Sequence, residues 1–324
     1  MKKVLVTGAA GFIGSHLTEF LVDQGAEVRA MVQYNSLGSW DWLEHSRVKN
    51  KIEVVMGDIR DYDFVENSVK GSNVVFHLAA LIGIPYSYVS PQAYIKTNID
   101  GTYNVLQSCR KLGIDELLVT STSETYGTAQ YVPIDEKHPA VGQSPYAATK
   151  VAADQLALSF HKSFDLPVKV VRPFNTFGPR QSARAIIPTI MSQLADGKTV
   201  IEVGDLSPKR DLTYVEDTVR GFWEIYKCKD CLGTATNICM QEEIAIGDLV
   251  KLILKVSGKT VDLKQDPARI RPKNSEVLRL FGSNERMKSL TSWLPKENLE
   301  SGLRKTWEWF QTHRDQYKSG LYNV

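Results

Sequence analysis

Residues 4–14 read Val-Leu-Val-Thr-Gly-Ala-Ala-Gly-Phe-Ile-Gly: a β-branched run, a glycine-rich turn and the start of an amphipathic stretch. This order predicts a strand, a tight turn and a helix. Gly8 allows the turn, Gly11 lets backbone amides approach an anion, and Gly14 permits close packing of helix on strand. The helix N-terminus adds free N–H groups and the positive end of its dipole. The segment therefore predicts binding of a dinucleotide pyrophosphate.

Short β-branched runs alternate with amphipathic stretches through the first half of the chain. Strands are expected at residues 4–7, 28–32, 52–56, 74–78, 117–120 and 168–172, and helices at 14–24, 62–69, 94–112 and 146–164. Such βαβ units predict an α/β fold with a doubly wound parallel Rossmann sheet. Gly and Pro make the pattern irregular after Pro173. We therefore expect a dinucleotide-binding domain over 1–174, with a returning segment near 212–240, and a smaller mixed substrate lobe over 175–324.

Composition narrows the class of protein. The 324 residues are 43% hydrophobic and 23% charged, with a formal net charge of +2. This balance gives no general attraction to nucleic acid or anionic membranes, and no apolar run suggests a signal or a membrane span. Cys228 and Cys231 form a Cys-x-x-Cys without a second ligand pair, so they are expected to be reduced thiols and not a metal site. A cytoplasmic protein is the expectation.

The end of the second expected strand bears on the choice of cofactor. Dinucleotide folds that bind NAD usually place a carboxylate there for the adenosine ribose. Here the strand runs into Gln33, Tyr34 and Asn35, with Arg29 upstream. The sequence therefore favours NAD only as a first choice and leaves NADP open.

A second pattern concerns Tyr146 and Lys150, four residues apart on one expected helical face. A lysine ammonium beside a phenol favours the phenolate, so the pKa of Tyr146 is expected to fall towards the working pH, which would let it take a proton from a substrate hydroxyl. Such pairs occur by chance in many helices. This one has a companion in residues 117–127, where a strand enters a polar loop that carries Thr122, Ser123 and Glu124.

These segments, with His77-Leu78-Ala79-Ala80, Asn98 to Asn104 and residues 172–180, resemble the extended short-chain dehydrogenase/reductases of the NAD-dependent epimerase/dehydratase family. The resemblance covers nearly the whole chain and implies a triad of Thr122, Tyr146 and Lys150. It also implies a tightly bound, recycled nicotinamide cofactor. The implied cofactor contacts are Gly8, Gly11, Phe12, Ile13, Gly14, Asp58, Ile59, Leu78, Ala79, Ala80, Tyr146 and Lys150. Asp58 would meet the adenine amine, with helix capping as its alternative, and His77 is expected to be a packed structural histidine.

Glu124 distinguishes between the reactions that this fold hosts. A 4-epimerase needs no second base, whereas a 4,6-dehydratase must also remove the carbon 5 proton and expel the carbon 6 hydroxyl. Glu124 supplies a carboxylate for that step, with Ser123 as its hydroxyl neighbour. The pair resembles GDP-mannose dehydratases, and the chain as a whole most resembles the legionaminic-acid pathway dehydratases, lyases of carbohydrate biosynthesis that act on GDP-N-acetylglucosamine. A UDP-glucuronate-type decarboxylase and a nucleotide-sugar 4-epimerase remain as alternatives.

The substrate lobe carries residues at positions where the family contacts a nucleotide-diphosphate sugar. Arginine suits this role because its guanidinium binds phosphate in a bidentate manner. The implied substrate contacts are Asn175, Arg180, Arg210, Arg271 and Glu276. The long expected helices at 94–112 and 146–164 carry apolar residues beyond one stripe, and similar chains pair these helices, so we expect a homodimer.

Overall fold

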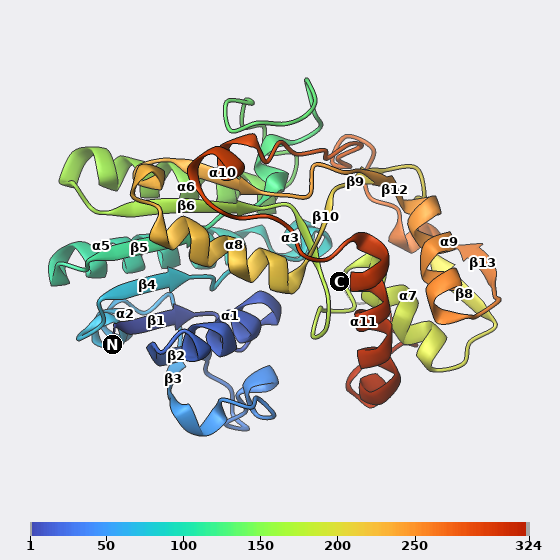
Figure 1. The fold of residues 1–324 in the computed structure, drawn as a ribbon, viewed down its shortest axis with the longest axis horizontal. Coiled ribbons are helices and arrows are strands. Elements are labelled where there is room, and N and C mark those ends of the chain that lie inside the picture. Colours follow the sequence, from blue (N-terminus) through green and yellow to red (C-terminus); the bar gives the residue numbers. More distant parts are fainter. Residues whose placement is uncertain (1, 322–324) are drawn as a thin grey trace.

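The computed structural model describes residues 2–321, and its centre is a seven-stranded parallel sheet (Figure 1). The strand order is β11-β6-β5-β4-β1-β2-β3. β2 and β3 therefore lie on one side of β1 and the later strands, from β4 on, lie on the other, so the order of the strands switches between β1 and β4. The strands are β1 (Lys3–Thr7), β2 (Glu27–Gln33), β3 (Ile52–Gly57), β4 (Val74–His77), β5 (Glu116–Thr120), β6 (Val168–Pro173) and β11 (Ala235–Ile238). The α/β Rossmann prediction is confirmed, and each predicted strand forms with only small changes at its ends.

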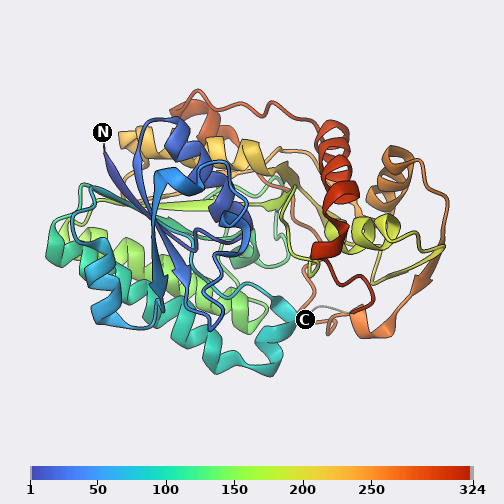
Figure 2. The ribbon, with the colours of Figure 1, turned by 90° about the horizontal axis from the view of Figure 1, so that it is seen from below.

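Both faces of the sheet are covered by helices, as Figure 2 shows. Side chains alternate along a strand, so Val4 and Val6 of β1 enter one apolar core while Leu5 between them enters the other. One face packs against α1 (Phe12–Asp23) and α8 (Val215–Lys227), and the other against α2 (Tyr62–Val69), α5 (Gly101–Leu112) and α6 (Pro145–Phe164). This double covering explains why the strands read as nearly continuous apolar runs.

Two helices differ from their predicted bounds. The helix predicted at 14–24 begins two residues earlier, at Phe12, because Gly11 is extended and caps it directly. The helix predicted at 94–112 is interrupted: α4 (Pro91–Tyr94) leads into a π-helical turn, η3 (Ile95–Asp100), before α5 begins. The buried side chain of Asn98 lies in this turn and bonds to the backbone of Leu81. A π-helical turn often marks such a functional position, and periodicity alone cannot reveal it.

The rest of the chain forms a smaller mixed lobe at the side of the sheet (Figure 1). It contains three short strand pairs and several helices. The strands are β7 (Asn175–Phe177), β8 (Val200–Val203), β9 (Lys209–Arg210), β10 (Leu212–Tyr214), β12 (Ile244–Ala245) and β13 (Asp262–Gln265). The helices of the lobe are α7 (Ile186–Ala195), α9 (Ile246–Ser257) and α11 (Leu299–His313). Helix α10 (Glu285–Leu290) packs instead at the β11 edge of the sheet, and α3 (Ile84–Val89) follows β4 (Figure 1).

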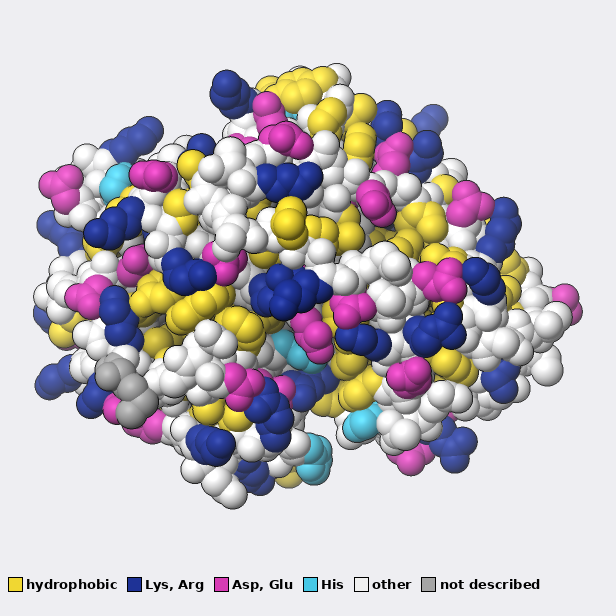
Figure 3. All heavy atoms as spheres, in the orientation of Figure 1, with side chains coloured by type: hydrophobic (Ala, Val, Ile, Leu, Met, Phe, Trp, Pro, Cys, Tyr) yellow, Lys and Arg dark blue, Asp and Glu magenta, His cyan; other side chains and the backbone are white. Residues whose placement is uncertain are grey.

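The chain passes between sheet and lobe more than once. After β10, helix α8 returns to the sheet and β11 pairs with β6, within the segment predicted to return near 212–240. The boundary at residue 174 stays a prediction. On the face shown in Figure 3, acidic and basic side chains are interspersed, in line with the small net charge.

Two smaller findings concern the bulk properties of the chain. Within residues 2–321, none of the helices combines the length and the apolar character needed to cross a membrane. Cys228 and Cys231 are free thiols, and Cys231 is buried at the end of α8. Burial raises the pKa of Cys231 to about 11, so this thiol is held in its protonated form. Among the described residues, no cluster of three or more potential ligands could hold a metal ion.

Candidate active site

The glycine turn lies at the carboxyl end of β1, beside the point where the strand order reverses. Gly8 has a φ of +68°, and a Cβ atom placed there would lie 2.7 Å from the backbone nitrogen of Ala79. A Cβ on Gly14 would lie 2.1 Å from the carbonyl oxygen of Gly8. Both positions therefore require glycine. No side chain caps the N-terminus of α1, so its first turn has the form of an anion site, and the predicted pyrophosphate contact stays a prediction.

The loop after β4 is tied to this turn through buried hydrogen bonds. The Thr7 hydroxyl accepts the backbone N–H groups of Leu78 and Ala79, each at 3.1 Å. The same oxygen contacts His77 Nδ1 at 2.8 Å, and His77 Nε2 lies 3.0 Å from the Thr102 hydroxyl. Burial lowers the pKa of His77 to about 3, with the charge of Lys150 adding to the effect. His77 is thus a packed, neutral histidine, as expected.

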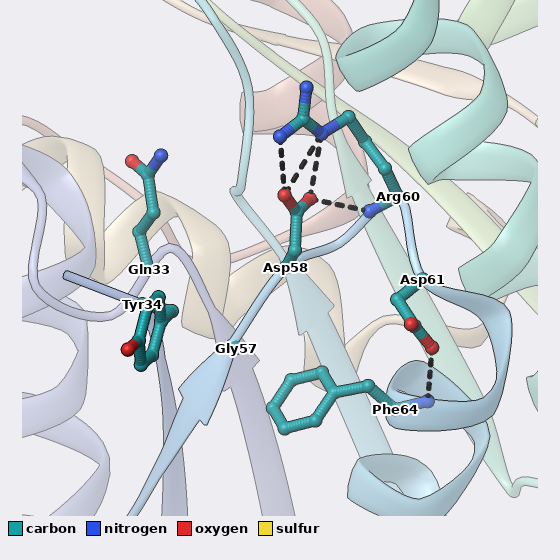
Figure 4. Close-up of a pocket in the computed structure, with 7 residues that line it drawn as sticks. All are labelled: Gln33, Tyr34, Gly57, Asp58, Arg60, Asp61 and Phe64. Atoms are coloured by element: carbon teal, nitrogen blue, oxygen red, sulfur yellow. Dashed lines mark hydrogen bonds and ion pairs between the residues drawn. The ribbon is translucent and has the colours of Figure 1, made fainter. Parts of the chain in front are cut away.

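A pocket of about 430 Å³ opens beyond the ends of β2 and β3 (Figure 4). Gln33 and Tyr34 form one side, Asp58 and Arg60 the other, and the ring of Phe64 lies over Gly57. The position matches the predicted adenine site. Asp58 is ion-paired with Arg60, whose Nε donates at 2.9 Å. The cap of α2 is Asp61 and not Asp58, so the helix-capping alternative for Asp58 is wrong.

Three predicted cofactor residues direct their side chains elsewhere. Ile59 packs against Gly101, and Phe12 and Ile13 pack against the core beneath α1. Any contact from these residues to a dinucleotide must therefore be made largely by backbone atoms. Arg29 is also engaged, because it pairs with Glu53 and donates to the carbonyl oxygens of Ser68 and Lys70.

The predicted triad comes together at the carboxyl end of β5. Thr122 precedes the 3-10 turn η4 (Ser123–Tyr126), and its side chain lies beside the buried Tyr146, near the start of α6, and acts to lower the pKa of that tyrosine. Lys150, one turn further along α6, donates from Nζ to the Thr120 carbonyl oxygen at 2.6 Å. Ser123 and Glu124 are buried in the same turn. The five predicted catalytic side chains therefore occupy one small region.

The electrostatics differ from the expectation in one respect. Burial raises the pKa of Tyr146; its bond to Thr122 opposes the shift, while the Glu124 charge reinforces it. Burial also lowers the pKa of Lys150, with Asp154 opposing the shift. The predicted fall in the Tyr146 pKa is therefore wrong for this structure, because desolvation of the phenolate outweighs any help from the lysine.

Three of the five predicted substrate residues meet in the smaller lobe. The Glu276 carboxylate accepts from Arg210 at 2.8 Å and lies 3.5 Å from Arg271. Asn175 sits on β7 with its side-chain oxygen buried and without a hydrogen-bond partner among the described residues, and its substrate role stays a prediction. Arg180 instead turns to α1, where it pairs with Glu19 at 2.8 Å.

Sequence reasoning missed several buried polar residues around the triad. Asp154 and Arg172 form an ion pair behind Lys150, and Tyr94 packs edge-on against Tyr146 at 6.2 Å between ring centroids. One signal was present: Asp154 continues the Tyr146 and Lys150 spacing by another four residues. A carboxylate on that face of a buried helix needs a partner.

Comparison with known proteins identifies the family. The family model described as GDP-mannose 4,6 dehydratase matches residues 5–306. The dTDP-glucose 4,6-dehydratase of Streptomyces griseus is 30% identical over 97% of this chain and 96% of its own length.

Solved structures agree. DesIV, a dTDP-glucose 4,6-dehydratase from Streptomyces venezuelae crystallised with NAD, superposes with a TM-score of 0.89 at 26% identity, covering 98% of this chain and 99% of that one. A UDP-glucuronic acid 4-epimerase from Bacillus cereus, also with NAD, gives 0.87 at 26% identity, with 96% and 99% coverage. The chain therefore belongs to the GDP-mannose 4,6-dehydratase family of extended short-chain dehydrogenase/reductases.

Proposed function

We propose that the protein is an NAD-dependent nucleotide-sugar 4,6-dehydratase that converts GDP-N-acetylglucosamine to its 4-keto-6-deoxy product. The observation that carries the reaction type is the buried turn that places Ser123 and Glu124 directly after Thr122, which contacts Tyr146. A carboxylate at this place is what elimination needs in addition to the oxidising pair. The dehydratases among the relatives support the same reaction type.

The residues of the site fit a dinucleotide. The glycine turn excludes side chains where a pyrophosphate would lie, and the pocket of Figure 4 accepts an adenine-sized group between Tyr34 and Asp58. Arg29 and Arg60 are both paired with carboxylates, which leaves neither free for a ribose 2′-phosphate. These pairings favour NAD over NADP, as do the neighbours crystallised with NAD.

The position of each catalytic side chain allows one step of the proposed dehydration. Tyr146 would take the proton of the carbon 4 hydroxyl. Because burial disfavours its phenolate, this role requires the positive charge of an oxidised nicotinamide nearby, and Lys150 would hold the ribose of the cofactor. When bound, the nicotinamide would supply the redox chemistry, as acceptor of the carbon 4 hydride and donor of that hydride to carbon 6. Glu124 removes the carbon 5 proton, which the new ketone has acidified, and passes it to the carbon 6 hydroxyl, which leaves as water beside Ser123. Carbon 5 regains a proton when hydride is added at carbon 6, and release of the proton that Tyr146 took from the carbon 4 hydroxyl balances this gain. The sum is loss of one water with no net oxidation.

Recognition of the nucleotide falls to the smaller lobe. Arg210, Arg271 and Glu276 form one charged cluster, in which the arginines suit a diphosphate and the carboxylate suits ribose hydroxyls. The guanine base is supported by the matching family model and the N-acetylglucosamine by the resemblance to legionaminic-acid pathway dehydratases.

A 4-epimerase is the second candidate, because a structural neighbour with that activity has a TM-score of 0.87. Purified protein incubated with GDP-, UDP- and dTDP-sugars distinguishes the two by product mass. We expect a product lighter by one water from GDP-N-acetylglucosamine, without accumulation of reduced cofactor. A product of unchanged mass would identify an epimerase, and loss of carbon dioxide from a uronic acid would identify a decarboxylase.

A further inference from the structure

A buried ion pair lies directly behind the candidate active site. Asp154 occupies the position two turns after Tyr146 on α6, and Arg172 comes from β6. Arg172 Nη2 donates to Asp154 Oδ2 at 2.7 Å, and their side chains are 9% and 3% exposed. Neither residue takes part in the proposed chemistry. Two charges withdrawn from water to this degree need a compensating role or compensating bonds.

The bonds of this pair lead to the turn that carries Glu124. Ser121, just before the turn, donates to Asp154 Oδ2 at 2.6 Å and accepts from Arg172 Nε at 3.2 Å. Tyr126, at the end of the turn, accepts from Arg172 Nη1 at 2.7 Å. The guanidinium and carboxylate thus hold both ends of the segment that contains Thr122, Ser123 and Glu124.

The planar guanidinium makes this a stiff connection. Its three bonds point in fixed directions to Asp154, Ser121 and Tyr126, so the positions of all three are coupled. The Tyr126 hydroxyl passes the connection on by donating to Asn237 Oδ1 on β11 at 2.8 Å. By contrast, the hydrogen bonds of the Thr122 and Thr125 side chains to backbone atoms remain inside the turn. They shape the turn but do not place it against α6.

We infer that Asp154 and Arg172 are positioning residues that fix Glu124 relative to Tyr146 and Lys150. The inference rests on the proposed function, in which Tyr146 serves oxidation and Glu124 serves elimination. Those two groups come from different elements, and the same substrate must meet both. A small displacement of the turn should therefore slow elimination more than oxidation, because α6 holds Tyr146 and Lys150 on its own backbone and oxidation depends on the turn only through Thr122.

The test uses variants that keep the size of the side chain. Tyr126→Phe removes the hydroxyl to which Arg172 donates but leaves the ring in place. Arg172→Lys keeps the positive charge but loses the planar guanidinium that bonds to three partners at once. The matched control is Tyr131→Phe, since Tyr131 is exposed and its hydroxyl donates to Asp135, away from the Asp154–Arg172 pair. Single-turnover experiments with holoenzyme and GDP-N-acetylglucosamine record reduced cofactor and dehydrated product separately. Hydrogen exchange of residues 121–127 records the order of the turn.

In both variants we expect elimination to fall about ten- to a hundredfold, with cofactor reduction changed less than about threefold and with faster exchange in the turn. Tyr131→Phe should behave as the wild type. Equal loss of both steps, or unchanged elimination, would overturn the inference. If the wild type dehydrates no nucleotide sugar at all, the proposed function fails, and the positioning role is then tested by hydrogen exchange alone. Unchanged protection of residues 121–127 in both variants would overturn that role.

Discussion

At the scale of single residues, Glu124 has the most specific task. Glu124→Gln preserves size and hydrogen bonding but cannot accept the carbon 5 proton. We expect oxidation at carbon 4 to proceed while dehydration falls by about 10²–10⁴, the usual loss for a positioned base. Cofactor absorbance after substrate addition and solvent deuterium incorporation at carbon 5 measure the two steps.

Tyr146→Phe is the matched comparison for that experiment. It removes the hydroxyl that contacts Thr122 and should leave the cofactor oxidised, because the first proton transfer is lost. Near-normal dehydration by Glu124→Gln would show that the carbon 5 base lies elsewhere in the site.

His77 gives a prediction about pH and stability. Its pKa falls from 6.5 in the unfolded chain to about 3 in the fold, so the unfolded state binds an extra proton between these values. Stability should therefore decrease as the pH falls below about 6.5, by roughly 2 kcal/mol from about pH 7 to about pH 5 for this group. Denaturant unfolding at several pH values measures the slope.

The variant for that measurement is His77→Asn, with the exposed His45→Asn as control. His77→Asn should be less stable at neutral pH but should lose less of its stability on acidification, while the control keeps the slope of the wild type. The same slope in all three proteins would contradict the assignment of the proton to His77.

At the scale of secondary-structure elements, a buried ion pair and an exposed one on neighbouring helices should contribute differently to the free energy of unfolding. Asp154→Ala removes the partner of the buried Arg172, and we expect a loss of about 3–5 kcal/mol, because a charge is left uncompensated in the interior. Asp100→Ala removes an exposed pair with Lys96 and should cost less than about 1 kcal/mol. Chemical denaturation compares the two; similar losses would contradict the expected contrast.

The elements also show what local sequence could and could not predict. Strands such as β1 and β3 were predictable because a parallel strand buried on both faces must be apolar throughout. The π-helical turn at Ile95–Asp100 was not predictable, because its buried Asn98 bonds to the backbone of Leu81, outside the helix. The spacing of apolar residues along the chain carries no information about such a partner.

In the candidate site, too, the features set by local sequence were predictable and those set by distant partners were not. The glycine turn and the Tyr146–Lys150 spacing are local patterns with a chemical reason, and the sequence predicted their place in the site. Arg180, a predicted substrate contact, donates from Nη2 to Glu19, which lies 161 residues earlier in the chain, while its Nη1 is buried without a partner among the described residues, so its substrate role stays a prediction. The Asp154–Arg172 pair joins a helix to a strand: the spacing of Asp154 indicates that it needs a partner, but the sequence does not show which residue supplies it. Only the packed structure shows which charges have already found partners.

At the scale of the whole molecule, α5 and α6 lie side by side on one face of the sheet (Figure 2) and present apolar groups to the outside. Tyr103 and Phe164 are 45% and 44% exposed, and Val151 and Leu158 are half-buried. A stable interface of about 1,600 Å² would cover such a surface. We predict a homodimer through these two helices, visible as twice the chain mass in light scattering at micromolar concentration.

The variant that tests this interface is Tyr103→Glu with Leu158→Glu, which places charges on both helices. We expect monomers with unchanged circular dichroism, because each carboxylate would otherwise be desolvated against the partner. Leu37→Glu is the control: Leu37 is 90% exposed on the loop after β2, far along the chain from both helices, and its substitution should leave the dimer intact. A wild-type monomer, or a double variant that still dimerises, would mean that α5 and α6 are not the interface and that their apolar groups simply face solvent.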